Sequence, residues 1–295
     1  MSTFSTIISQ IVNGLQSGSI YALVALGYSM VYGIILLLNF AHGDIIMVGA
    51  YAAWMCMVNF NLHPLISILV AVVSSTVLGV LIERVAYKPL RSAPRLSLLI
   101  TAIGVSFLLE NGFQLIFGAG AQTVPALISG PNLTVGSIYL SFPAVMTIVV
   151  SLISMAALTF LVQKTKLGKA MRAVSEDMGA AQLMGISLNK TITFTFTMGS
   201  ALAGIASVLY LCAYPQTSPM MGSMLGLKAF VAAVLGGIGS IPGAMIGGFA
   251  IGLAEALVSA VHLSVWKDGV VFAILIIVLL VKPTGIMGKS VTEKV

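Results

Sequence analysis

Charged residues are scarce in this sequence. Asp, Glu, Lys and Arg make up 7% of the 295 residues, whereas hydrophobic residues make up 59% and the mean hydropathy is +1.10. A soluble domain carries about 25% charged residues, so the composition excludes a soluble globular protein. A membrane-spanning helix needs about 20 apolar residues, so the length accommodates roughly eight to ten such helices and leaves no room for a soluble catalytic domain.

Cysteine is also rare, and nucleotide-binding signatures are missing. Cys56 and Cys212 lie in apolar segments, with no Cys or His at the spacing of a metal site. We therefore expect small buried side chains at both positions, no metal ion and no catalytic residues. The stretch Gly288–Ser290 matches the end of a phosphate-binding loop, but such a loop begins with a glycine, and Pro283 stands there. The chain itself is not expected to bind ATP or another cofactor.

The net charge of +6 comes from basic residues that cluster beside apolar segments. Such clusters mark the cytoplasmic ends of membrane helices, whereas a nucleic-acid-binding surface shows a basic face interleaved with aromatic residues. The clusters are Arg84, Lys88, Arg91 and Arg95; Lys164–Lys190; and Lys282, Lys289 and Lys294. The uncharged segments that this orientation places outside are Asn59–His63, Gly118–Tyr139 and Ala213–Gly226.

The hydrophobic pattern predicts an all-α integral membrane protein, with one transmembrane domain over residues 1–295. No Lys or Arg precedes the apolar run from Ile7, as a cleavable signal would require, so the first segment is expected to be retained. Several candidates are short for a full crossing, so interrupted or re-entrant helices are expected where protein surrounds them. If all candidates cross, both termini are cytoplasmic. The candidates are Ile7–Leu26, Ser29–Leu38, Ile45–Val58, Pro64–Ile82, Leu96–Phe117, Leu140–Val162, Thr191–Cys212, Leu227–Leu235, Ala244–Val261 and Gly269–Val281.

One long polar segment, Lys164–Lys190, interrupts this pattern with seven of the chain's 22 charged residues. Because lipid tolerates neither charge nor unpaired backbone, the segment must lie in water. Within it, positions 174, 178, 181 and 184 form one apolar stripe of a helix, with Ser175 as the expected N-cap and Gly185 as the expected C-cap. A solvated linker helix would explain the same pattern, although two adjacent spans need a much shorter connection.

Two short segments are candidates for a translocation path. In Asn39–Asp44, three polar side chains lie between apolar runs, where they must face protein or a water-filled cavity; Gly43 permits a broken backbone and a close approach. Asp44 alternatively caps a helix that begins at Ile45. In Gly236–Gly243, Pro242 begins or breaks a helix. The glycines here, which include Gly237, Gly239 and Gly243, suit either helix packing or contact with a substrate.

The two segments form a weak internal repeat, because Leu38–Tyr51 and Leu235–Phe249 each combine an apolar piece, a glycine-containing turn and a helix with small residues. Paired interrupted segments indicate a transporter's central site, although two glycine-rich helices share such a pattern by chance. Isolated charges include Lys228 and Glu255, which we expect to neutralise one another, and Glu110, expected at the interface or paired within the bundle. These charges are too scattered for a proton relay.

The spacing of Glu176, Ala180, Ala181 and Gly185 resembles the cytoplasmic coupling loop of ABC importer permeases. The stretch Arg172–Ile186 is most similar to the branched-chain amino acid permeases. Two ranges already named, Leu38–Tyr51 and Leu235–Gly248, also resemble that family, as does Lys282–Gly288, so the resemblance covers nearly the whole chain. It implies that Arg172, Glu176, Ala180, Ala181 and Gly185 couple the membrane domain to an ATPase. From their chemistry and spacing, the candidates to line the path are Asn39, His42, Gly43, Asp44, Gly237, Gly239 and Gly243.

The resemblance implies a permease subunit for branched-chain amino acids in a bacterial or archaeal inner membrane. Its expected partners are a homologous second permease, two ABC ATPase subunits that bind the ATP, and an extracytoplasmic substrate-binding protein. Related permeases for urea, amides or other small solutes remain an alternative, as does a secondary transporter that needs no ATPase. A membrane scaffold without transport would need no paired broken helices.

Overall fold

The computed structural model describes residues 3–36, 38–91, 93–135 and 138–288. The α-helices in this part of the chain are α1 (Thr3–Ile35), α2 (His42–Val58), α3 (Pro64–Ile82), α4 (Arg95–Phe117), α5 (Phe142–Lys164), α6 (Lys166–Glu176), α7 (Met178–Leu183), α8 (Leu188–Ala213), α9 (Met221–Gly236), α10 (Ile241–Ala260) and α11 (Lys267–Val281). A π-helical turn (Glu83–Tyr87) and a 3₁₀ turn (Lys88–Leu90) extend α3, and a second 3₁₀ turn (Ser264–Trp266) precedes α11.

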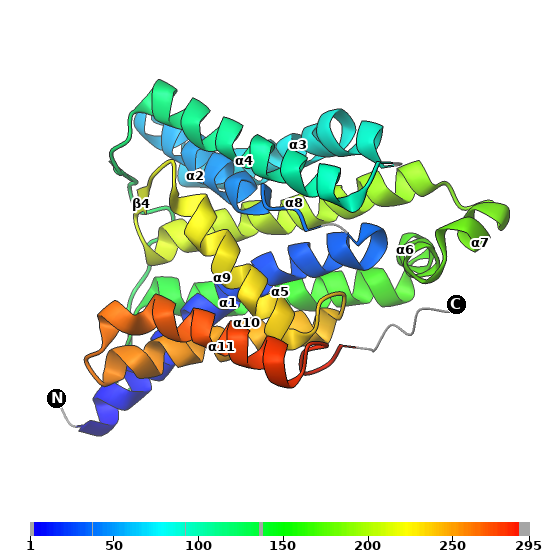
Figure 1. The fold of residues 1–295 in the computed structure, drawn as a ribbon. Helices are drawn as coiled ribbons and strands as arrows, with labels where there is room; N and C mark the ends of the chain where they lie inside the picture. Colours follow the sequence, from blue (N-terminus) through cyan, green and yellow to red (C-terminus); the bar gives the residue numbers. More distant parts are fainter. Residues whose placement is uncertain (1–2, 37, 92, 136–137, 289–295) are drawn as a thin grey trace.

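The long helices form one elongated bundle and run roughly along its axis (Figure 1). Among the described residues, seven helices are long and apolar enough to cross a membrane, and α2 and α9 are shorter apolar helices. The prediction of an all-α polytopic membrane protein is therefore confirmed. The α6–α7 segment protrudes from one end of the bundle, where the basic clusters of α3, α4 and α5 also lie (Figure 1). The clustering of Lys and Arg makes this the cytoplasmic end.

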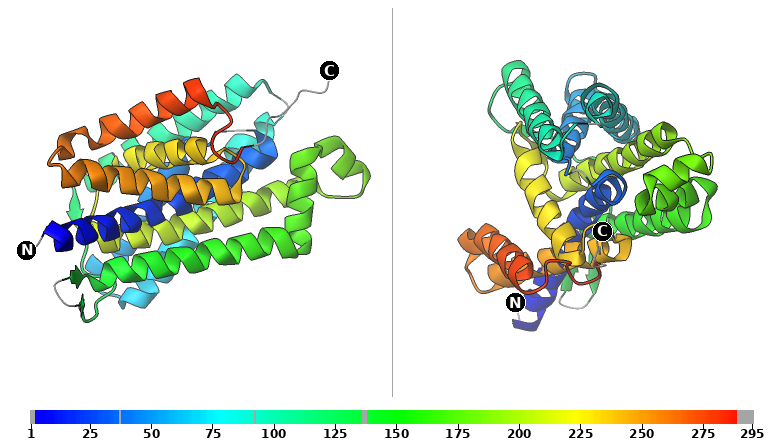
Figure 2. Two further views of the ribbon diagram at one scale, coloured as in Figure 1. Left: turned by 90° about the horizontal axis from the view of Figure 1, so that it is seen from below. Right: turned by 45° about the vertical axis from the view of Figure 1, so that its right-hand side comes forward.

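Helix α1 passes through the centre of the bundle (Figure 2, right). Residues 18–31 are all buried, and α1 packs against α10, α8, α9 and α5. The sequence predicted two segments here, Ile7–Leu26 and Ser29–Leu38, but the helix is continuous. A single Gly27 weakens a helix by only about 1 kcal/mol, which does not break it. Consequently α1 begins at the outer end of the bundle, and the condition for two cytoplasmic termini, that all ten candidates cross separately, is not met (Figure 2, left).

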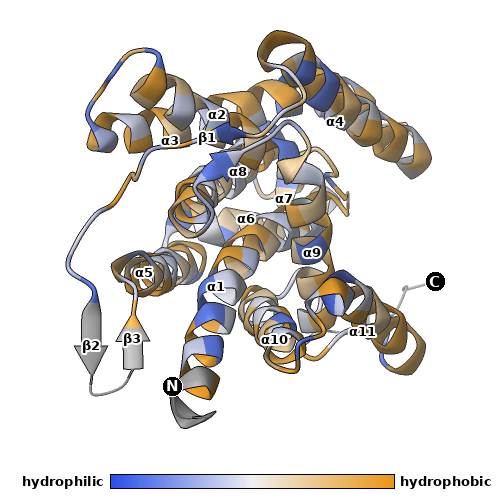
Figure 3. Cartoon of the chain, turned by 90° about the vertical axis from the view of Figure 1, so that its left-hand side faces the viewer, coloured by the Kyte–Doolittle hydropathy of each residue, from blue (hydrophilic) through white to orange (hydrophobic). Residues whose placement is uncertain are grey.

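The outer end carries the short strands and the uncharged connections. Strand β1 (Gln122–Thr123) pairs antiparallel with β4 (Gln216–Thr217), and β2 (Leu133–Val135) pairs with β3 (Ile138–Leu140). Residues 221–226 are the first turns of α9 rather than a loop, which corrects the predicted start at Leu227. The peripheral helices α4 and α11 expose apolar side chains such as Leu115, which is 87% exposed, as a lipid-facing helix must (Figure 3).

Glycines let α10 lie close to two neighbouring helices. A Cβ atom at Gly248 or Gly252 would overlap with α1 at Ala22 or Gly18. A Cβ atom at Gly247 would overlap with the carbonyl oxygen of Ala232 on α9. These three glycines of α10 therefore allow close helix packing, as small residues do in membranes.

Candidate functional site

The polar segment Lys164–Lys190, which we call the coupling segment, begins with a tight turn between α5 and α6. The hydroxyl of Thr165 caps α6 by accepting a 3.1 Å hydrogen bond from the N–H of Gly168. A Cβ atom at Gly168 would overlap with the carbonyl oxygens of Leu161 and Val162. The turn therefore requires glycine at this position. The sequence reasoning missed this requirement, although the cap residue and the glycine lie only three residues apart in the polar segment.

Helix α6 packs its apolar side chains onto the cytoplasmic end of the bundle. Met171 and Val174 are buried, and α6 contacts α1, α5 and α8. The predicted coupling residues Arg172 and Glu176 lie on the exposed side of this helix. Helix α6 is thus anchored to the core on one side and open to solvent on the other.

The single predicted helix is in fact two, because the chain breaks at Asp177. The backbone at Asp177 is extended (φ −158°, ψ 110°), and its carboxylate accepts a 2.9 Å hydrogen bond from the N–H of Ala180. Asp177 is therefore the N-cap of α7. The predicted cap, Ser175, instead donates its hydroxyl to the carbonyl of Arg172 within α6. The break also divides the predicted stripe, since Val174 is buried but Met184 is exposed.

Gly185 ends α7, as predicted. Its φ of +82° is in the left-handed region that favours glycine. The N–H of Gly185 bonds to the carbonyl of Gln182, and the N–H of Ile186 bonds to that of Ala181, each at 3.0 Å. This pair of bonds is the Schellman motif, which satisfies the free carbonyls of a helix end.

Helix α7 presents apolar side chains to water. Leu183 is 90% exposed and Met184 is 82% exposed, although both lie in the protruding cytoplasmic segment rather than in the lipid-facing part. Ala180 is also exposed, whereas Ala181 is buried against the bundle. Exposed apolar residues that gather on a polar segment mark an interaction surface. Leu183 was not singled out from the sequence because hydrophobic residues are common throughout this chain.

The other candidate segment lies inside the bundle, where α2 begins. After α1 the chain reverses at Leu36, whose φ of +51° is uncommon for a residue with a side chain. It then returns into the protein, and residues 41–47 are all buried. Helix α2 is therefore a short helix that begins within the core, as predicted for one of the short candidates. Its N-cap is Ala41, which provides no side-chain cap, so the predicted capping by Asp44 does not occur.

Polar side chains at this buried helix start are incompletely paired. The hydroxyl of Tyr87 donates a 2.6 Å hydrogen bond to Oδ1 of Asn39, but Nδ2 of Asn39 has no partner among the described residues. The ring of His42 packs edge-on against Tyr28 with centroids 4.9 Å apart, and its Nε2 also lacks a described partner. Buried polar groups are rarely left unpaired, so these atoms are available to water or to a solute.

Asp44 lies in the first turn of α2 and is fully buried. Neither oxygen of its carboxylate has a hydrogen-bond partner among the described residues, although Ser106 of α4 lies near it. Glu110, also on α4, accepts a hydrogen bond from Ser223 on α9. It is thus paired within the bundle, which was one of the two expectations.

Gly43 lies where α2 crosses α9. A Cβ atom at Gly43 would overlap with the carbonyl oxygen of Gly222, and one at Gly226 would lie 3.1 Å from Cα of Gly43. The predicted close approach at Gly43 is correct, but Gly43 is helical and the predicted broken backbone is absent. Gly222 and Gly226 were missed because they were assigned to a loop, although their i, i+4 spacing is a packing signal.

The turn between α9 and α10 supplies the third group of candidates. Gly237 and Gly239 have φ values of +105° and +89°. Ser240 then caps α10 by accepting from the N–H of Gly243, and Pro242 occupies the first turn. The segment 282–288 folds back beneath this turn, where Ile286 and Met287 donate their N–H groups to Leu235 and Gly236 at 2.8 and 2.9 Å. This contact gives the Lys282–Gly288 stretch a structural role.

The two path candidates contact α1 at different levels. A Cβ atom at Gly27 would overlap with Nε2 of His42, and one at Gly239 would lie 3.7 Å from Cα of Gly33. Six residues of helix span about 9 Å. The structure therefore places the start of α2 deeper in the bundle than the α9–α10 turn, along the same central helix.

An ion-pair cluster lies toward the outer end. Nζ of Lys228 is 2.7 Å from Glu255 and 2.6 Å from Asp268, and the hydroxyl of Tyr21 donates a 2.8 Å hydrogen bond to Glu255. The predicted pairing of Lys228 with Glu255 is confirmed. At the cytoplasmic end, buried Glu83 pairs with Arg91 and accepts a 2.9 Å hydrogen bond from Thr193.

Known proteins of one family resemble this chain over almost its whole length. Residues 10–279 match the family described as "Branched-chain amino acid transport system / permease component". The chain is 43% identical to the high-affinity branched-chain amino acid transport system permease protein BraD of Pseudomonas aeruginosa, over 98% of both chains. It is 44% identical to the permease protein LivH of the corresponding system of Escherichia coli, over 99% of both chains.

A more distant relative is the ribose import permease protein RbsC of Haemophilus influenzae, which is 24% identical over 92% of this chain and 84% of its own. No solved structure matches the chain. These relatives are transport permeases rather than enzymes. With its apolar helices and this similarity over its whole length, the protein is a multi-pass protein of the cytoplasmic membrane and a permease component of a multicomponent transport system. The chain belongs to the branched-chain amino acid transport permease family.

Proposed function

We propose that this protein is the transmembrane permease subunit of an ABC importer that moves branched-chain amino acids into the cytoplasm. Separate ATPase subunits bind and hydrolyse the ATP. An extracytoplasmic binding protein delivers the solute, and a homologous second permease completes the membrane domain. The printed functions of the relatives at 43% and 44% identity support the choice of solute.

The exposed apolar surface of α7 is the observation that carries the energy-coupling part of the proposal. Leu183 and Met184 extend into the cytoplasm on a helix that is capped at both ends, by Asp177 and by Gly185. A short, rigid helix with exposed apolar side chains suits insertion into a groove of a soluble partner. Because α6 joins α7 to the central helix α1, a push on α7 reaches the core.

Leucine uptake into vesicles that contain the full complex tests this role. We expect Glu176→Lys, Gly185→Trp and Leu183→Asp each to reduce ATP-driven uptake severely while the permease remains in the membrane. The matched control is Lys190→Gln, which changes an exposed residue of the cytoplasmic end outside α6 and α7. Normal uptake by all three variants would overturn the coupling role. Uptake by this chain without any ATPase would instead indicate a secondary transporter.

The second part of the proposal is that Asn39, His42, Gly43 and Asp44, together with Gly237, Gly239 and Gly243, border the translocation path. The unpartnered atoms of Asn39, His42 and Asp44 support it, because a passing solute or water would satisfy them. Gly43 and Gly243 contribute by allowing close helix contacts, at Gly222 and Gly236. Alternating access then requires that these segments be exposed to one side of the membrane at a time.

Cysteine labelling tests the path. In a background with Cys56→Ala and Cys212→Ala, single cysteines at positions 39, 42, 44 and 239 should react with a water-soluble maleimide at rates that depend on the nucleotide state of the complex. A cysteine at Ala102, which is buried on α4, should remain unreactive in every state. Inaccessibility of all four path positions in every state would exclude them from the path.

A further inference from the structure

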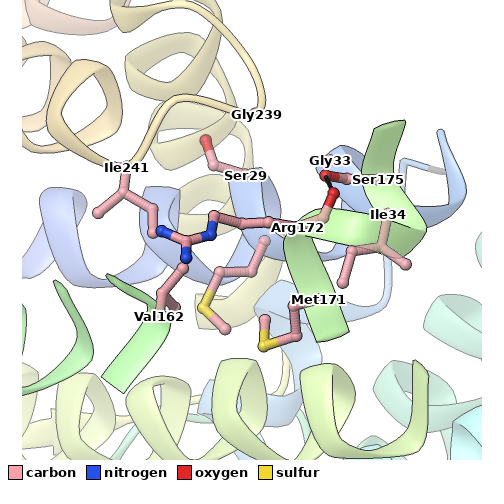
Figure 4. Close-up of a pocket in the computed structure, with 10 residues that line it drawn as sticks. Ser29, Gly33, Ile34, Val162, Met171, Arg172, Ser175, Gly239 and Ile241 are labelled. Atoms are coloured by element: carbon pink, nitrogen blue, oxygen red, sulfur yellow. Dashed lines mark hydrogen bonds between the residues drawn. The ribbon is translucent and has the colours of Figure 1, made fainter. Parts of the chain in front are cut away.

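A cavity of about 90 Å³ lies beside the packed face of α6. It lies between α6, the cytoplasmic half of α1, the end of α5 and the α9–α10 turn (Figure 4). One ordered water needs about 10–15 Å³ of such space, so the cavity suits a molecule of several heavy atoms. The cavity is distinct from the start of α2, because none of the residues 39–44 lines it.

The lining combines one cation with an apolar wall. The guanidinium of Arg172 lies across the cavity near Val162 and Ile241 (Figure 4), and its described hydrogen bond is a long one of 3.4 Å to the carbonyl of Gln163. The apolar wall includes Met30 and Ile34. Among the described residues, no carboxylate lines the cavity. Arg172 is an exposed residue at the mouth of the cavity, and its guanidinium has none of the carboxylate or phosphate partners that its planar fork matches best among the described residues.

Ser29 provides an independent indication of a ligand. Ser29 is 1% exposed and lines the cavity, and its buried hydroxyl has no hydrogen-bond partner among the described residues (Figure 4). A hydroxyl in a helix usually bonds to the carbonyl four residues earlier, as Ser19 does with Leu15 at 2.7 Å in the same helix. The hydroxyl of Ser29 thus retains an unused hydrogen bond at the wall of the cavity.

We propose that this cavity binds a small aliphatic carboxylate from the cytoplasmic side, with Arg172 and Ser29 holding the carboxylate and the apolar wall holding the alkyl chain. The absence of an acidic lining residue means that an amino group is not recognised. A branched-chain amino acid and the corresponding 2-oxo acid both have the required carboxylate and alkyl group, whereas the corresponding amine lacks the carboxylate.

Occupation of the cavity would inhibit transport. A ligand held by Arg172 on α6 and by Ser29 on α1 ties the coupling helix to the central helix in one arrangement. A ligand that binds one state shifts the population toward it, so the other states of the transport cycle become less populated. The inhibition rests on the proposed function, since it assumes that α6 moves relative to α1 during transport. The binding of a carboxylate in the cavity does not depend on that function.

The test uses the full complex in vesicles whose lumen represents the cytoplasm and contains ATP. Leucine, 4-methyl-2-oxopentanoate or 3-methylbutylamine is placed in the lumen, and the initial rate of labelled leucine uptake is compared with the rate of the same variant with none of them. We expect leucine and the 2-oxo acid to slow uptake by about fivefold or more, and the amine to have no effect. Ser29→Ala and Arg172→Gln should relieve the inhibition. Lys169→Gln, an exposed basic residue of α6 that does not line the cavity, should retain it.

Binding of labelled 4-methyl-2-oxopentanoate to the purified complex, measured by equilibrium dialysis without ATP, gives a readout that does not depend on transport. Saturable binding that Ser29→Ala weakens supports the site. Absence of saturable binding, equal binding by Ser29→Ala and Lys169→Gln, or equal inhibition by the amine would overturn it. If uptake fails even with an empty lumen, the proposed function fails, and dialysis still decides whether the site exists.

Discussion

The hydroxyl of Tyr87 donates a 2.6 Å hydrogen bond to Oδ1 of Asn39. This bond joins the π-helical turn at the cytoplasmic end of α3 to the segment that leads into α2. Both residues are buried, at 1% exposure each. The position of the α2 start therefore depends on an element 48 residues later in the chain.

Replacing Tyr87 tests that dependence. Tyr87→Phe keeps the ring but leaves a buried acceptor unpaired, which costs about 1–3 kcal/mol. We expect a lower melting temperature of the purified complex and faster labelling of a cysteine at position 42. Tyr32→Phe is the matched control, since Tyr32 is on α1 and is half-buried. Equal behaviour of the two variants would mean that the bond does not position α2.

The second prediction is that the Asp177 cap keeps α7 folded as a helix. Asp177→Ala removes the N-cap, which costs about 1 kcal/mol, so amide hydrogen exchange in residues 180–184 should accelerate about fivefold. Asp177→Asn keeps a capping oxygen and should exchange nearly as slowly as the natural protein. Ser175→Ala should leave α7 unchanged, because the Ser175 hydroxyl bonds within α6. Faster exchange in Ser175→Ala than in Asp177→Ala would restore Ser175 as the cap.

The Lys228–Glu255 pair allows a third prediction. Its side chains are 14% and 9% exposed, and breaking a buried pair costs about 3–5 kcal/mol because one charge is left unpaired. Lys228→Met and Glu255→Gln should therefore each lower the yield of folded complex, and the double variant should recover much of the loss. Asp268→Asn should have a small effect, since Asp268 is 49% exposed. Additive losses in the double variant would show that the two residues are not coupled.

A fourth prediction concerns helix packing at Gly43. The added methyl group of Gly43→Ala would overlap with the carbonyl oxygen of Gly222, and overpacking of this kind costs about 1–3 kcal/mol. We expect loss of assembled permease in detergent gels. Gly104→Ala is the control, because no atom lies within 4 Å of its added Cβ and α4 faces lipid there. Comparable assembly of both variants would contradict the close α2–α9 contact.

Hydropathy was enough to predict the membrane class, most helices and the position of the coupling segment, because lipid exposure imposes long apolar runs and water imposes charge. It did not predict that α1 is continuous, because a glycine such as Gly27 is expected both where a helix breaks and where two helices pack closely. The break at Asp177 was missed because capping depends on the backbone conformation of one residue, and Ser175 and Asp177 are both good caps. The geometry around Asn39 was not predictable, because its partner Tyr87 is distant in sequence.

The backbone bonds from Ile286 and Met287 to the end of α9 impose an order on biogenesis. Chains are synthesised from the N-terminus and their parts fold as they emerge. The α9–α10 turn is made before α10 and α11, and both of these helices must cross the membrane before residues 286 and 287 can reach it. When the ribosome has synthesised α10, the residues of the turn exist, but residues 286 and 287, which hydrogen-bond to the end of α9, have not yet been made. Pinning of this turn, which borders the cavity beside α6, therefore follows the membrane insertion of α10 and α11.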